Sequence, residues 1–217
     1  MKLYAVALSP FAARVRLALR IKGLAYDMVP PPGGSTRSPE FLAINPIGKL
    51  PVLVTDDGVV VPESETIIDY LEDFFPVPSL LPADRVARAR MTNAIRTFEL
   101  YATPAMLRLF KQMDPAVRDA KIVEAEIGNL RNGLALTAHF VDDAIFAVGG
   151  AISKADCILL PSLLLCEVTA SIFDLGDILT EAPVLANYRE KARRHADMGA
   201  IWDETAAALA EFRNRSN

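Results

Sequence analysis

Residues 45–67 read NPIGKLPVLVTDDGVVVPESETI, and this stretch decides the fold. Two apolar, β-branched runs, residues 50–55 and 59–61, flank the turn sequence Asp56-Asp57-Gly58. Asp-Gly between such runs favours a tight β-hairpin. Pro62 ends the hairpin, and residues 63–75 then place apolar side chains at helical spacing. The stretch therefore predicts strand, turn, strand and helix.

The residues before this stretch predict a strand-helix-strand unit. Residues 2–8 form an apolar run, and Pro10 begins a helical pattern that stops near Gly23. Residues 24–29 read as a second strand, and a loop and a short helix at residues 39–44 follow. The expected order of the amino-terminal part is βαβαββα.

The prolines divide the chain into two differently built parts. Eleven of the fifteen prolines fall at or before Pro82, and Pro76, Pro78 and Pro82 make a stiff connection. Every later segment has helical period, beginning with residues 84–113 and continuing from Asp114, from Ser153, after Pro183 and after Gly199. We expect an α/β domain at residues 1–76, a linker at 77–84 and an all-α domain at 85–217.

Composition and charge exclude several function classes. The 217 residues carry a formal charge of −4 without a long basic run, which disfavours nucleic acid as a partner. Cys157 and Cys166 lack the spacing of a metal site, so we expect no metal. No uninterrupted apolar run is long enough to span a membrane, and the amino terminus lacks a signal peptide. These features predict a cytoplasmic chain without a membrane partner.

Four motifs in this order resemble those of the cytosolic glutathione transferases. Residues 45–53 are similar to the family's turn into its glutathione-binding strand, and Pro62-Glu63-Ser64 resembles its Glu-Ser motif at a helix start. Residues 153–156, SKAD, resemble the capping box of its core helix, and residues 9–16 resemble the active-site loop of serine-type (theta, zeta or tau-like bacterial) members. The resemblance implies a thioredoxin-like domain followed by an all-helical domain.

The resemblance also implies how glutathione is bound. Pro51 is expected to follow a cis peptide that presents the backbone of Leu50 to the cysteinyl part of glutathione. Glu63 and Ser64, at a helix start, would hold the γ-glutamyl group, because free N–H groups and the helix dipole favour a carboxylate there. Lys49 would meet the glycyl carboxylate. Each position also has an ordinary structural explanation, such as a trans proline or a plain helix cap.

Ser9 is the catalytic candidate. A hydroxyl that donates a hydrogen bond to sulfur would favour the thiolate of glutathione, and the helix that begins at Pro10 would act in the same direction. The alternative is that Ser9 is only a helix cap. Tyr4 is a rival hydroxyl for which a core position is expected, and the role of Arg14 stays open.

Glutathione would be the co-substrate, and an apolar electrophile would be the second substrate of this transferase. Its pocket is expected to include aromatic and apolar side chains from both parts of the chain: Phe11, Tyr101, Pro104, Met106, Leu107, Phe110 and Trp202. Glutathione-dependent isomerisation, dehalogenation or ether cleavage remain alternatives, as does a non-catalytic binding protein. The family further implies a detoxifying homodimer, whereas the identity of the electrophile, the subclass and the dimer interface do not follow from the residues.

Overall fold

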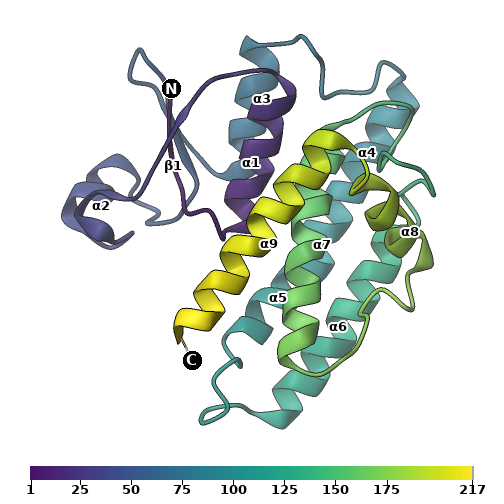
Figure 1. Cartoon of the computed structure of the whole chain (residues 1–217). Coiled ribbons are helices and arrows are strands. Elements are labelled where there is room, and N and C mark those ends of the chain that lie inside the picture. Colours follow the sequence, from purple (N-terminus) through teal and green to yellow (C-terminus); the bar gives the residue numbers. More distant parts are fainter. Residues whose placement is uncertain (217) are drawn as a thin grey trace. The chain divides into compact units, whose positions relative to one another are not determined.

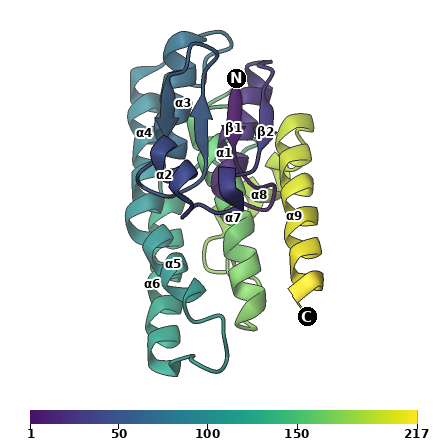
Figure 2. The same ribbon diagram turned by 90° about the vertical axis from the view of Figure 1, so that its left-hand side faces the viewer.

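The computed structural model describes residues 1–216. Its first compact unit contains a four-stranded sheet in the order β2-β1-β3-β4 (Figures 1 and 2). The strands are β1 (Lys2–Tyr4), β2 (Asp27–Val29), β3 (Val52–Val54) and β4 (Val60–Pro62). Strand β2 pairs with β1 in parallel, whereas β1 with β3 and β3 with β4 are antiparallel. A parallel neighbour requires a crossover connection, which the first helix supplies.

Helices complete the βαβαββα order that the sequence predicted. They are α1 (Pro10–Ile21), the 3₁₀ turn η1 (Pro32–Gly34), α2 (Pro39–Ile44) and α3 (Ser64–Phe74). The thioredoxin-like fold class is thereby confirmed. The first strand, expected over residues 2–8, ends at Tyr4, because the chain turns before α1 and the Ser9 N–H donates to the Val6 carbonyl.

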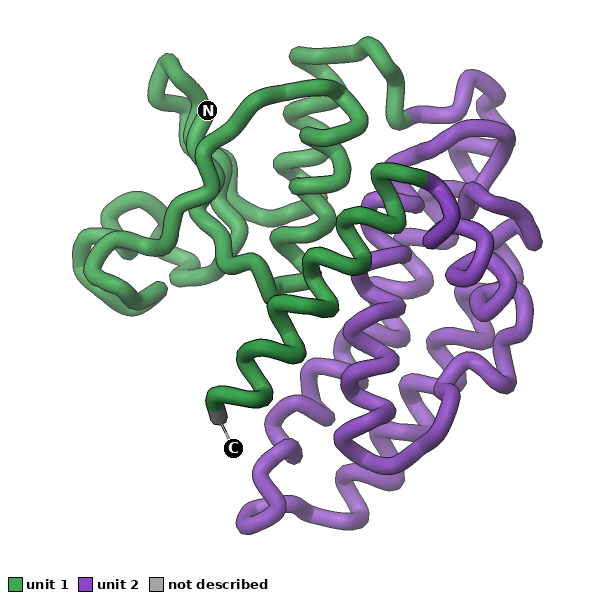
Figure 3. The backbone as a smooth tube through the Cα atoms, in the orientation of Figure 1, with its two compact units in different colours: residues 1–80, 196–217 green, residues 81–195 purple. Residues whose placement is uncertain are grey.

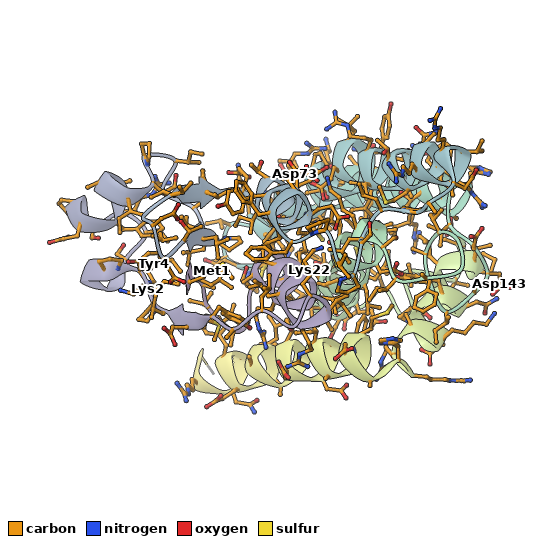
Figure 4. The ribbon with its side chains drawn as sticks, turned by 90° about the horizontal axis from the view of Figure 1, so that it is seen from above. Met1, Lys2, Tyr4, Lys22, Asp73 and Asp143 are labelled. Atoms are coloured by element: carbon orange, nitrogen blue, oxygen red, sulfur yellow. The ribbon has the colours of Figure 1, made fainter. Side chains whose placement is uncertain are left out.

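A buried ion pair joins the end of α1 to α3, and the same ammonium group also reaches the segment after α3. The Lys22 ammonium donates to Glu72 Oε2 at 2.7 Å and to the carbonyls of Phe75 and Pro78 at 2.6 and 3.0 Å. Burial opposes ionisation of Glu72, but hydrogen bonds from Lys22, Ser79 and the backbone of residue 80 lower the pKa of its carboxyl below the usual value. Figure 4 labels Lys22 at the end of α1 and Asp73 on α3. The pair fixes the chain that leads out of α3.

Helix α9 (Ala196–Ser216) belongs to the same compact unit as the sheet, which comprises residues 1–80 and 196–217 (Figure 3). It contacts α1, and its Glu204 carboxylate accepts hydrogen bonds from Arg16 and, at 2.7 Å, from Arg20. The helix begins at Ala196, so Gly199 lies inside it rather than before it as expected. The domain limits at 76 and 85 stay a prediction.

The second compact unit, residues 81–195, is helical. Its elements are α4 (Arg85–Thr97), the π-helical turn η2 (Phe98–Ala102), α5 (Thr103–Phe110), α6 (Ala120–Ala138), α7 (Lys154–Ile172) and α8 (Pro183–Ala192). The helix expected from Asp114 begins instead at Ala120. Asp119 caps it by accepting from the N–H groups of Lys121 and Ile122, whereas Asp114 caps only a turn at Ala116.

The helical segment that the sequence predicted at residues 84–113 is interrupted before Pro104 by the π-helical turn η2. Proline lacks an N–H and clashes with the carbonyl four residues earlier, which disturbs the turn before it. Gly133 of α6 packs directly against this turn. A Cβ at Gly133 would lie 2.5 Å from the Ala102 nitrogen, so only glycine permits this approach.

Helix α7 forms the core of the helical unit. It is the one helix among residues 1–216 whose length and hydropathy match a membrane span, but 78% of that window is buried inside the protein. Its start carries the expected capping box, in which the Asp156 carboxylate accepts from the Ser153 N–H at 2.7 Å. Asp156 also accepts from the Ala147 N–H and from the Tyr188 hydroxyl.

We predict that Asp156 makes the stability of the fold depend on pH. Burial raises the pKa of its carboxyl to about 6, although the hydrogen bonds it accepts oppose this rise. The folded state therefore binds this proton more tightly than the unfolded chain does. Protonated Asp156 contributes its full share to the free energy of unfolding below the unfolded pKa of about 3.8, and this share is lost as pH rises through 6. The loss corresponds to about 3 kcal/mol.

Urea unfolding of the wild-type chain and of the Asp156→Asn variant, measured from about pH 4 to pH 7, isolates this group. The wild type should lose stability relative to the variant, whose amide does not titrate, across that interval. A difference that is constant with pH, or that grows in favour of the wild type, would contradict the assignment.

Candidate functional site

The strand register brings several loops to one end of the sheet. Tyr4, the last residue of β1, pairs with Val52, the first residue of β3. Val52 also pairs with Pro62, the last residue of β4, and Tyr4 also pairs with Val29, the last residue of β2. The chain therefore leaves β1, β2 and β4, and enters β3, at the same end.

The segments at this end contain the residues that the sequence singled out. The chain runs from β1 to Ser9 at the start of α1, and Leu50 and Pro51 directly precede β3. Glu63 and Ser64 directly follow β4. The loop after β2 contains Arg37, which the sequence analysis did not select. The register thus gathers the predicted glutathione-binding residues around one edge of the sheet.

The turn into β3 is held by Asn45. The buried Asn45 side chain donates from Nδ2 to the Lys49 carbonyl at 2.9 Å and accepts at Oδ1 from the Ile47 N–H at 3.1 Å. The peptide between Leu50 and Pro51 is cis, as expected. Lys49 is exposed and Leu50 is half-buried, so both lie at the surface of the turn.

The Arg37 guanidinium lies against Gly48, the residue before Lys49. Gly48 has φ +65°, and a Cβ there would lie 3.0 Å from Arg37 Nη1 and 3.1 Å from the Thr36 carbonyl oxygen. Glycine at this position therefore lets the loop after β2 pack on the turn before β3. This packing joins segments that are distant in the sequence, so the only sign of it in the sequence is the glycine at position 48.

The start of α3 provides a site for an anion. The first hydrogen bond into the helix runs from the Ile67 N–H to the Glu63 carbonyl, so the N–H groups of Ser64 and Thr66 have no acceptor within the helix. Glu63 has φ +67°, a conformation that favours glycine and costs about 1–3 kcal/mol in other residues. The exposed Glu63 carboxylate and the buried Ser64 thus flank backbone donors at the positive end of a helix.

Ser9 caps α1 and keeps a donor for a ligand. Its Oγ accepts from the Ala12 N–H at 3.3 Å, and Pro10 is the first residue of the helix. A hydroxyl that accepts through its oxygen still carries one hydrogen that it can donate. The cap and the catalytic role, which the sequence left as alternatives, are therefore compatible.

Arg14 and Tyr4 have structural environments of their own. Arg14 is buried, and its guanidinium carbon lies 4.6 Å from the centre of the Phe11 ring. Tyr4 is half-buried and makes an edge-to-face contact with Phe41, with ring centres 6.1 Å apart. The contact with Phe41 agrees with the packing role expected for Tyr4.

The residues expected to line the electrophile pocket belong to both units. Phe11 and Trp202 lie in the first unit, where Trp202 is buried. In the second unit Tyr101 and Leu107 are exposed, Pro104 and Phe110 are half-buried, and Met106 is buried, where its Sδ accepts from the Cys166 thiol at 3.8 Å. The assignment of these residues to one pocket stays a prediction.

Within residues 1–216, no group of three or more His, Cys, Asp or Glu side chains is arranged to hold a metal ion. Cys157 and Cys166 are buried free thiols. The polar groups gathered at the sheet edge are hydroxyl, backbone N–H and ammonium or guanidinium donors, together with the Glu63 carboxylate as an acceptor. Such a set recognises a zwitterionic peptide-like ligand with more than one carboxylate.

Comparisons with known proteins identify the family of the chain. The model of the glutathione S-transferase amino-terminal domain matches residues 3–79. The chain is 35% identical to maleylacetoacetate isomerase from Pseudomonas aeruginosa over 77% of this chain and 82% of that protein. It is 31% identical to glutathione S-transferase 1 from Dianthus caryophyllus, over 88% of this chain and 86% of that protein.

A solved structure extends the likeness to three dimensions. The glutathione S-transferase of Methylobacterium radiotolerans, solved in complex with glutathione sulfonate, superposes with a TM-score of 0.74. It is 26% identical, and the match covers 92% of each chain. The sheet order, the gathered loops and these relatives together lead to one conclusion: the chain is an enzyme of the glutathione transferase family.

Proposed function

We propose that Ser9 activates glutathione by donating its hydroxyl hydrogen to the glutathione sulfur. The observation that carries this proposal is the position of Ser9 at the start of α1, where its oxygen accepts from the Ala12 N–H and its hydrogen is available to a ligand. The positive end of the helix dipole acts on the same atom and also favours an anion.

The expected size of the effect is sufficient for catalysis near neutral pH. A free thiol has a pKa of about 8.5. A hydrogen bond to a charged group contributes about 1.5–3 kcal/mol, which would lower this pKa by roughly one to two units. Much of the bound glutathione would then be thiolate without a metal or a second base.

The remaining residues of the sheet edge would orient the tripeptide. The backbone of Leu50, next to Pro51, would pair with the cysteinyl part. The start of α3 would hold the γ-glutamyl carboxylate through Ser64 and backbone N–H groups, and Glu63 would accept from the α-ammonium group. Lys49, together with Arg37, would pair with the glycyl carboxylate.

The thiolate would attack an apolar electrophile, forming a carbon–sulfur bond while the electrophile releases its leaving group or takes up a proton. In the helical unit, the exposed Tyr101 and the half-buried Pro104 and Phe110 would supply apolar surface for it. Binding both reactants in one place removes the entropic cost of their encounter. A cytoplasmic, detoxifying homodimer with domains at residues 1–76 and 85–217 completes this proposal.

Glutathione-dependent isomerisation is a second candidate activity, supported by the likeness to maleylacetoacetate isomerase. In this reaction the thiolate would add to one carbon of a conjugated cis double bond. Rotation about the resulting single bond, followed by loss of the sulfur, would give the trans product and regenerate glutathione. Ser9 would serve both activities in the same way, because each needs only the thiolate.

We expect Ser9→Ala to raise the pKa of the bound thiol by roughly one to two units and to lower turnover of a reactive aryl halide at neutral pH about 10–100-fold. Ultraviolet difference spectra of bound glutathione across pH measure the first quantity. Ser9→Thr, which keeps a hydroxyl, should retain most of the activity, and Tyr4→Phe should leave the thiol pKa unchanged. A shifted pKa in Tyr4→Phe together with an unshifted one in Ser9→Ala would assign the donor to Tyr4 instead.

We expect Glu63→Ala and Ser64→Ala each to weaken glutathione binding by about 10–100-fold, because each removes a hydrogen bond to a charged group of the ligand. Calorimetric titration measures the affinity. Thr66→Ala is the matched control, since it shortens a side chain in the same turn but leaves its backbone N–H in place. Unchanged affinity in both Glu63→Ala and Ser64→Ala would rule out the start of α3 as the anion site.

A further inference from the structure

The turn that leads into α1 has a central peptide whose carbonyl does not take part in closing the turn. The Ser9 N–H donates to the Val6 carbonyl at 3.0 Å, which closes a turn over residues 6–9. The Ala7 carbonyl belongs to the central peptide of this turn, and the common turn types differ in how that peptide is rotated. Its orientation therefore affects the position of Ser9, the last residue of the same turn.

Arg16 of α1 hydrogen-bonds to this carbonyl. Its Nη1 donates to the Ala7 oxygen at 3.5 Å, and its side chain is only 8% exposed, so little water competes for its N–H groups. A hydrogen bond of this length is weak. It can orient the turn only if the guanidinium group is itself held in place.

Glu204 of α9 holds that guanidinium group. Helix α9 lies beside α1 (Figure 1), and both oxygens of the Glu204 carboxylate accept from it. Oε2 accepts from Arg16 Nη2, and Oε1 accepts from Arg20 Nη2 at 2.7 Å. Arg16 and Arg20 are four residues apart, so they lie on the same face of α1. The second arginine thus fixes the carboxylate in the orientation that the first one needs.

We propose that Glu204 is a positioning residue, which acts through Arg16 on the turn of residues 6–9 and so places the Ser9 hydroxyl. The planar guanidinium group suits this task, because it donates in two directions at once, to the carboxylate from Nη2 and to the Ala7 carbonyl from Nη1. The inference rests on the proposed role of Ser9 and gives α9 a part in the activation of glutathione.

Glu204→Ala separates positioning from charge, since the two have opposite effects on the pKa of the bound thiol. Removal of a carboxylate would by its charge alone favour the thiolate and lower this pKa. Loss of positioning would raise the pKa, because the Ser9 hydroxyl would donate to the sulfur less often. We expect a rise of about 0.5–1 unit, smaller than that for Ser9→Ala because the hydroxyl remains.

The measurement is ultraviolet titration of bound glutathione in the full-length protein. Arg16→Lys should also raise the thiol pKa, because a single ammonium group keeps the charge but cannot donate to both the carboxylate and the carbonyl. Arg20→Ala is the matched control. It removes the other partner of Glu204, so it should lower the melting temperature but leave the thiol pKa near the wild-type value.

Calorimetric titration with S-methylglutathione, which has no thiol proton, tests whether the tripeptide site stays intact. Its affinity should change less than about two-fold in Glu204→Ala and Arg16→Lys, because neither residue is assigned to bind the tripeptide. A loss of affinity as large as that expected for Ser64→Ala would show general damage to the site and overturn the specific role of Glu204. Arg16→Lys keeps a cation opposite Glu204, so it decides the question if Glu204→Ala fails to fold.

The double variant Ser9→Ala/Glu204→Ala completes the test. If Glu204 acts through Ser9, the double variant should have a thiol pKa no higher than that of Ser9→Ala. The inference is overturned if the two rises add, or if Ser9→Ala raises the pKa while Glu204→Ala and Arg16→Lys do not. An unchanged pKa in Ser9→Ala would overturn the proposed function, and this inference with it.

Discussion

The pairing of Val52 with both Tyr4 and Pro62 is the constraint on which the candidate site depends. Val52 begins β3, and its two partners end β1 and β4. Because antiparallel pairing places the start of one strand beside the end of the next, this register alone brings Ser9, Pro51 and Glu63 to the same edge of the sheet. A shift by one residue would also turn buried Val52 and Leu53 toward the opposite faces.

The site uses the unsatisfied ends of helices rather than dedicated polar clusters. Ser9 caps α1, and Ser64 begins α3, so the free backbone N–H groups and positive dipole ends of two helices lie at this end of the sheet. The Ser9 hydroxyl serves the fold through its oxygen, and in the proposed function its hydrogen would serve the ligand. Glu63 is in a strained backbone conformation, because it has a positive φ that glycine would adopt more readily.

The sequence alone predicted those elements that depend only on residues close together in the chain. The Asp57-Gly58 hairpin, the helix begun by Pro10 and the capping box of α7 depend on neighbouring residues, and each was predicted correctly. The cis peptide before Pro51 could be predicted only from the family resemblance, which rests on the order of the four motifs. Arg37 was missed because its position over Gly48 joins two loops that only the folded sheet brings together.

The remaining differences have similar causes. Asp114 and Asp119 are both residues of a type that caps helices, and only the folded chain decides that Asp119 caps α6. Gly199 suggested a helix start, but α9 begins three residues earlier, at Ala196, and packs on α1. The first strand is shorter than predicted because the chain turns toward Ser9 directly after Tyr4, and the apolar run at residues 2–8 gives no sign of this turn.

The most direct test is calorimetric titration of the wild-type protein with glutathione near neutral pH, in two buffers that differ in ionisation enthalpy. If the site holds the thiolate, binding releases a proton from the thiol to the buffer, and S-methylglutathione, which has no thiol proton, binds without this release. The account predicts a proton release that is present with glutathione and absent with S-methylglutathione. Equal proton release for both ligands, or no binding of glutathione at millimolar concentration, would contradict it.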